Sequence, residues 1–185
     1  MVARSELILR WSVYGGAGLL VCLVQGLILQ RLDLWGVMPF LYPALAAMVA
    51  VWEGAVPRGA VYALCLGIAC DLALPGGIPC FYTIALPLAA ILAGLLTREW
   101  LSSHLLSALA ASALSYLVTG LLHAGVLAVT GHGAFVTAMA VAGKEFLITL
   151  PALPLLYLLP AFGILTVYML LVCGVFRLLD HVKEQ

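Results

Sequence analysis

Long apolar runs, separated by short segments rich in glycine, proline and charge, organise this chain. A membrane-spanning helix needs about 20 predominantly apolar residues, and six runs approach that length. They lie at about residues 11–29, 38–52, 59–74, 80–96, 105–129 and 155–176. The pattern predicts a single polytopic membrane domain over residues 1–185, built as an all-α, six-helix transmembrane bundle.

One further apolar segment, residues 134–150, precedes the last run. It contains Lys144 and Glu145, and Pro151 follows it. We expect it to form an interfacial or re-entrant helix at the outer face of the membrane. Counting it as a seventh span would place the basic residues after the last run outside, against the excess of Lys and Arg that cytoplasmic loops carry.

The composition supports a membrane protein. Hydrophobic residues make up 65% of the chain, charged residues 9%, and the mean hydropathy is +1.21, whereas a soluble domain carries about 25% charged residues. The formal net charge is zero, so no basic patch indicates nucleic acid. With both termini in the cytoplasm, six basic residues face inward: Arg4, Arg10, Arg58, Arg98, Arg177 and Lys183.

The stretch GIACDLALPGG holds the acidic residue of the third run, Asp71. Helical spacing puts Asp71 on one face with Gly67, so its side chain should point into the bundle. A carboxylate near the C-terminal end of a helix is unfavourable by ~0.3–1 kcal/mol. We expect the backbone N–H groups of Gly76 and Gly77, in the turn Pro75-Gly76-Gly77, to offset this cost. The alternative is a contact with a partner or ligand, since intramembrane acids are functional candidates.

A second pair of charges, Glu53 and Arg58, flanks a Gly-Pro loop predicted on the cytoplasmic side. The two side chains can pair, but an exposed ion pair contributes only ~0–1 kcal/mol. A solvated loop is therefore the favoured interpretation.

Small residues recur at helical spacing in several runs, as in Ala85, Ala89 and Ala93, and we interpret these stripes as helix packing faces. The four histidines are scattered, the five cysteines form no CxxC pair, and no second acid stands beside Asp71. The sequence therefore predicts no catalytic, cofactor or metal site.

The segment from Pro39 to Trp100 resembles the rod shape-determining protein MreD family of bacteria. The resemblance rests on "PFLYPALAAMVAVWEGAVPRG", "GIACD", "PGG" and "LAGLLTREW". Phe40 follows Pro39 where the family pattern has an acidic residue.

The resemblance implies a non-enzymatic scaffold of the cell-wall elongation machinery in the bacterial cytoplasmic membrane. Such a protein binds the single-span protein MreC and helps couple MreB filaments to the synthases RodA and a class B penicillin-binding protein. The family's fold is similar to that of the substrate-binding (S) components of energy-coupling-factor transporters. An S subunit for a vitamin or another small molecule is therefore the alternative function, and an intramembrane enzyme acting through Asp71 is a third.

Overall fold

Helices form nearly all of the part of the chain that the structure describes. The computed structural model describes residues 2–32, 34, 36–73, 78–100, 104–131, 135–159 and 163. The α-helices are α1 (Val2–Leu27), α2 (Tyr42–Glu53), α3 (Ala60–Ala73), α4 (Phe81–Trp100), α5 (His104–Thr130) and α6 (Phe135–Thr149). Short helical turns lie at η1 (Leu29–Arg31) and η3 (Leu150–Ala152), and η2 (Ala55–Gly59) is a kink between α2 and α3 in which Val56 has an extended backbone. No strand occurs within these ranges.

Four helical stretches are long and apolar enough to cross a membrane by length and composition. They are Leu7–Arg31, Val56–Ala73, Leu106–Thr130 and Phe135–Leu159, and the shorter Phe81–Thr97 is also apolar. The chain is thus an all-α, multi-pass membrane protein. The predicted total of six spans stays a prediction, because most of residues 155–176 lies outside the described residues.

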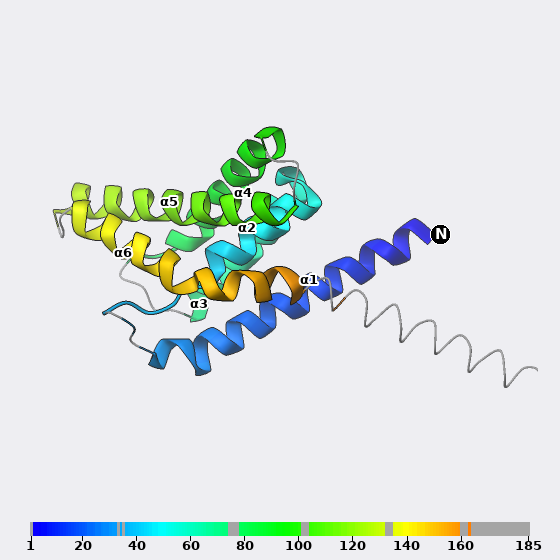
Figure 1. Ribbon diagram of the computed structural model, residues 1–185, viewed down its shortest axis with the longest axis horizontal. Helices are drawn as coiled ribbons and strands as arrows, with labels where there is room; N and C mark the ends of the chain where they lie inside the picture. The colour runs from blue at the N-terminus through cyan, green and yellow to red at the C-terminus, as the bar shows by residue number, and fades with distance from the viewer. Residues whose placement is uncertain are drawn as a thin grey trace, which may run out of the picture.

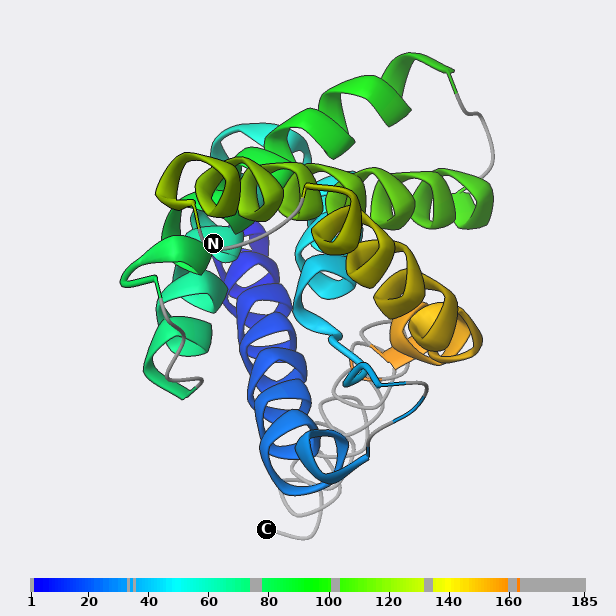
Figure 2. The same ribbon diagram turned by 90° about the vertical axis from the view of Figure 1, so that its left-hand side faces the viewer.

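Helix α2 is the core of the bundle. All of its residues from Tyr42 to Ala50 are buried, and in both views other helices surround it (Figures 1 and 2). Its sequence is apolar on every side, which suits a helix with no exposed face. Its 12 residues span only about 18 Å at ~1.5 Å per residue.

The run predicted at residues 38–52 becomes helical only at Tyr42. Pro43 lies in the first turn of α2, where a missing N–H removes no helical hydrogen bond. Residues 38–41 form no helix, although Phe40 and Leu41 are buried. The chain therefore enters the core as a non-helical segment and continues as a short helix.

Helices α3, α4, α5 and α6 pack sequentially, each on the next, and α2 packs against α3, α4 and α5. The small residues predicted to form packing stripes are buried at these contacts, since Ala85, Ala89 and Ala93 are each 0% exposed. Helix α1 lies along one side, and its N-terminal part projects beyond the other described helices (Figure 1). Its leucines Leu19 and Leu23 are exposed.

The segment after α5 forms one helical run with an interruption. α6 continues through the 3₁₀ turn η3, which contains Pro151, into helical residues 153–159. Proline lacks the N–H of a regular α-helix, and a 3₁₀ turn accommodates it. The interfacial placement predicted for residues 134–150 stays a prediction, but residues 135–150 of this segment belong to a stretch that can also span a membrane.

Candidate functional site

Asp71, near the end of α3, caps the first turn of α4. Its Oδ1 accepts the backbone N–H of Tyr82 at 3.1 Å, and its Oδ2 accepts the N–H of Thr83 at 2.8 Å and the Thr83 hydroxyl at 2.6 Å. The first N–H groups of a helix lack partners within the helix, and this end carries a partial positive charge. Asp71 therefore meets both needs of α4, which offsets its unfavourable position at the end of α3.

The capping carboxylate comes from another helix because the residue before α4 cannot supply it. Cys80 lies immediately before Phe81, has a φ of 57° and is exposed. A thiol is only a weak acceptor, whereas Ser, Thr, Asp and Asn are the usual capping residues. Asp71 takes that role from the preceding helix.

Gly67 lies one helical turn before Asp71 and allows α3 to approach α4 closely. A Cβ at this position would collide with the carbonyl oxygen of Tyr82 and lie 2.9 Å from the Cα of Thr83. The motif G-x-x-x-D thus contacts the same two residues of α4 twice, through a backbone contact at Gly67 and hydrogen bonds at Asp71.

The predicted partners of Asp71 were Gly76 and Gly77. These residues and Pro75 lie outside the described residues, and the partners that the structure places at Asp71 are Tyr82 and Thr83. Among the described residues, Asp71 therefore holds the start of α4. This is a structural role, as one of the two interpretations expected, but its partners are residues of α4.

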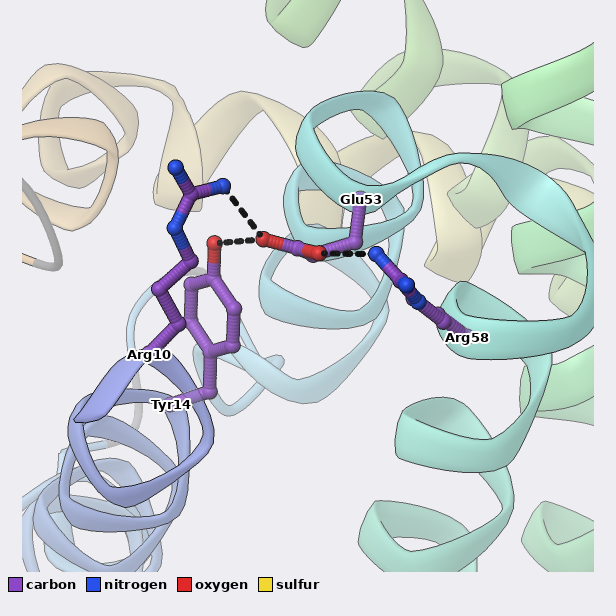
Figure 3. Close-up of polar contacts among 4 residues, drawn as sticks. All are labelled: Arg10, Tyr14, Glu53 and Arg58. Carbon is purple, nitrogen blue, oxygen red and sulfur yellow. Dashed lines mark hydrogen bonds and ion pairs between the residues drawn. The ribbon is translucent and has the colours of Figure 1, made fainter. Parts of the chain in front are cut away.

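Glu53, the last residue of α2, gathers one tyrosine and two arginines (Figure 3). Its Oε1 accepts the hydroxyl of Tyr14 at 2.8 Å and lies 3.5 Å from Nη1 of Arg10, and its Oε2 lies 3.4 Å from Nη1 of Arg58. We refer to these four residues as the Glu53 cluster. The Glu53 side chain is only 4% exposed, whereas each arginine side chain is 52% exposed. The solvated-loop interpretation is therefore wrong for Glu53.

The Glu53 cluster connects three parts of the chain: α1, the end of α2, and η2. A carboxylate here is unfavourable for two reasons: it is buried away from water, and the C-terminal end of a helix carries a partial negative charge. The donors of Arg10, Tyr14 and Arg58 offset that cost. The backbone carbonyl of buried Tyr14 also accepts the hydroxyl of Tyr62 at 3.0 Å, which ties α1 to α3. Arg10 and Arg58 thus lie at the same end of the bundle, as the predicted topology requires.

The non-helical segment before α2 is held by two polar side chains that sequence reasoning missed. Gln25 donates from Nε2 to the carbonyl of Pro39 at 2.6 Å and accepts the N–H of Leu41 at Oε1 at 3.2 Å. The hydroxyl of Tyr116 donates to the carbonyl of Phe40. Non-helical backbone at membrane depth needs partners within the protein, and these contacts supply them. A polar Gln25 within the first apolar run was the signal available in the sequence.

Glu145 of α6 is a further carboxylate in an apolar helix, besides Asp71 and Glu53. It is partly buried and lies close to the middle of the stretch Phe135–Leu159. A charged side chain at the centre of a spanning helix costs at least ~2.5 kcal/mol. Glu145 lines a pocket of about 70 Å³ between α4, α5 and α6, whose wall includes Phe40, Phe81, Tyr82, Thr119 and His123. We refer to this site as the Glu145 pocket.

Two apolar grooves flank α1. One, of about 300 Å³, lies between α1 and residues 148–159. The other, of about 310 Å³, is lined by Ser12, Val13, Gly16, Ala17, Leu20, Leu159 and Gly163. Among the glycines of α1, Gly18 faces the inside of the bundle, since a Cβ there would lie 3.1 Å from Oη of Tyr62. A Cβ at Gly15 would meet no described heavy atom within 4 Å.

Within the described part of the chain, no three His, Cys, Asp or Glu residues cluster in a way that could hold a metal ion. No family model, curated protein or solved structure matches this chain.

Proposed function

We propose that this protein is a non-enzymatic membrane scaffold that binds the transmembrane helix of a partner along α1. The observation that carries the proposal is the exposed face formed by Ile8, Gly15, Leu19 and Leu23. These residues follow one another at steps of seven, four and four, so they share one side of α1. Ile8, Leu19 and Leu23 are 64%, 69% and 61% exposed, and no described atom covers Gly15.

The composition of this face suits a helix partner. A glycine at the contact lets two helix backbones approach closely in a membrane, and flanking leucines supply packing on both sides. Three polar side chains that could compete for a partner, those of Asp71, Glu53 and Gln25, bond within the bundle instead. Recognition along α1 then depends on shape and packing.

The resemblance of Pro39 to Trp100 to the MreD family directs the choice of partner. It favours an MreC-like single-span protein of the bacterial cytoplasmic membrane. Through that partner, the scaffold acts in the cell-wall elongation machinery, coupling MreB filaments to RodA and a class B penicillin-binding protein.

The test is co-purification from detergent with the MreC-like protein encoded by the same genome. Gly15→Leu places a bulky side chain on the proposed face and should lower the amount of recovered partner at least tenfold. Gly125→Leu is the matched control on α5, where a Cβ also meets no described atom within 4 Å, and it should leave recovery unchanged. Equal recovery with wild type and Gly15→Leu would overturn the proposed face.

A second candidate function is the S subunit of an energy-coupling-factor transporter. It is favoured by the groove of about 300 Å³ between α1 and residues 148–159, a volume at the lower end of those that hold small ligands. Mass spectrometry of the denatured, purified protein is the test. A stoichiometric small molecule would support this candidate. If no small molecule is found and the MreC-like partner co-purifies, the scaffold function is supported instead.

A further inference from the structure

The Glu145 pocket combines an acid with a row of aromatic side chains. Ring centroids lie 5.1 Å apart for Phe40 and Tyr82, 5.1 Å for Phe81 and Tyr82, and 5.4 Å for Phe81 and His123. These four rings come from the segment before α2, from α4 and from α5, and all of them line the pocket with Glu145 of α6. The site is thus assembled from four separate parts of the chain.

Glu145 differs from the other two carboxylates described above. Asp71 and Glu53 each have several donors, whereas within the described residues the Glu145 carboxylate makes no hydrogen bond or ion pair. The neighbouring Lys144 forms no ion pair with Glu145 either, since both ion pairs among the described residues are made by Glu53. A partly buried anion in a membrane helix is normally paired with a positive group or faces water.

The lining of the pocket selects among cations. A metal ion needs several oxygen, nitrogen or sulfur ligands, and no suitable group of three occurs among the described residues. An organic ammonium is instead attracted by a carboxylate and by the faces of aromatic rings. The volume of about 70 Å³ exceeds the ~10–15 Å³ that a single water molecule needs, which leaves room for an ammonium and its first carbon.

We propose that the Glu145 pocket binds a primary ammonium group, with Glu145 as the counter-ion and the rings of Phe81 and Tyr82 as walls. The ammonium comes from a free amine or from the headgroup of an aminolipid, since both present the same chemistry. The Asp71 cap positions one wall, because it holds the backbone N–H of Tyr82. This proposal is independent of the scaffold face on α1.

The test uses the full chain in phosphatidylcholine nanodiscs, titrated with ¹³C-methylammonium and followed by NMR. Binding should broaden the methyl signal and move it upfield through the ring currents of the aromatic walls. Glu145→Gln should weaken binding at least tenfold, and Phe81→Leu should weaken it several-fold and reduce the upfield shift. Lys144→Gln, a change of the exposed neighbouring residue, should bind no more weakly than wild type.

Two further arms complete the experiment. Bulky tetramethylammonium should not compete, and circular dichroism should show that Glu145→Gln and Phe81→Leu keep the helical content of wild type. Adding phosphatidylethanolamine to the nanodiscs should lower methylammonium affinity if the headgroup is the natural source, and should leave it unchanged if the source is a free amine. Equal binding by wild type and a folded Glu145→Gln variant, or equal competition by tetramethylammonium, would overturn the proposal.

Discussion

The carboxylate of Asp71 accepts the backbone N–H of Thr83 at 2.8 Å, so the last turn of α3 holds the first turn of α4. The Thr83 hydroxyl donates to the same oxygen at 2.6 Å. This contact joins two helices that Pro75, Gly76 and Gly77 separate in the sequence, and it gives the intramembrane acid a structural role.

We expect Asp71→Asn to lower the free energy of unfolding by ~0.5–2 kcal/mol, the range for loss of a helix cap. The amide keeps one acceptor oxygen but loses the negative charge that faces the N-terminus of α4. Thermal unfolding of the purified protein in detergent measures the change. A double-mutant cycle with Thr83→Val should give a coupling energy of at least ~0.5 kcal/mol, and strictly additive effects would contradict the direct contact.

Gly67→Ala should destabilise the protein by ~1–3 kcal/mol, the range for overpacking. The added methyl group would meet backbone atoms of Tyr82 and Thr83, which cannot rotate away as a side chain could. Gly15→Ala is the matched control, since its Cβ meets no described atom within 4 Å. The control should be neutral or stabilising by up to ~1 kcal/mol, and an equal loss of stability in both variants would show that close helix approach is not the cause.

Glu53→Gln should lower the free energy of unfolding by ~1.5–3 kcal/mol, the range for hydrogen bonds to charged groups. The change removes the charge shared by Arg10 and Arg58 and weakens the acceptor of Tyr14. Arg10→Gln and Arg58→Gln should each cost under ~1 kcal/mol, because both arginines are half-exposed and solvent screens them. The double arginine variant should cost more than the sum of the singles. Chemical unfolding of the five proteins measures these differences, and additivity would indicate that the arginines act separately.

Gln25→Leu should cost ~2–6 kcal/mol, because it leaves the carbonyl of Pro39 and the N–H of Leu41 without partners, at ~1–3 kcal/mol for each buried group. Tyr116→Phe removes the single donor that the structure places at the carbonyl of Phe40 and should cost ~1–3 kcal/mol. Thermal unfolding and protease sensitivity of residues 36–41 are the measurements. Tyr157→Phe is the control, because this partly buried tyrosine packs its ring against Trp52 and the change keeps that ring. It should change stability little, so similar losses in both tyrosine variants would argue against the specific role of Tyr116.

The pattern of apolar residues predicted many of these helices, because the hydrogen bonds of a helix join residues only four positions apart in the sequence. The third run, predicted at residues 59–74, is the helix Ala60–Ala73, and the fifth, predicted at 105–129, is His104–Thr130. The shared face of Gly67 and Asp71 also follows from the helical repeat alone. These features depend on neighbours within one or two turns, which a sequence displays directly.

Other features depend on residues far apart in the chain. Tyr14 and Glu53 are separated by 39 positions and Tyr116 and Phe40 by 76, so no local pattern pairs them. The contact of Tyr116 with Phe40, together with those of Gln25, satisfies the buried backbone before α2, so α2 begins only at Tyr42. The rings that join Glu145 at its pocket come from three other parts of the chain, which only the packing of the helices brings together.

The sequence by itself determined a membrane protein made of helices, because apolar runs in lipid must satisfy their backbone internally. It also determined which faces carry small residues and that Asp71 points inward. Tertiary structure alone decided what each polar side chain contacts: Asp71 holds α4, Glu53 is buried among donors from α1 and η2, and Glu145 lines a pocket with aromatic rings. The physical reason is that a buried charge is stabilised by whichever groups the fold brings within hydrogen-bonding distance, and those groups come from other helices.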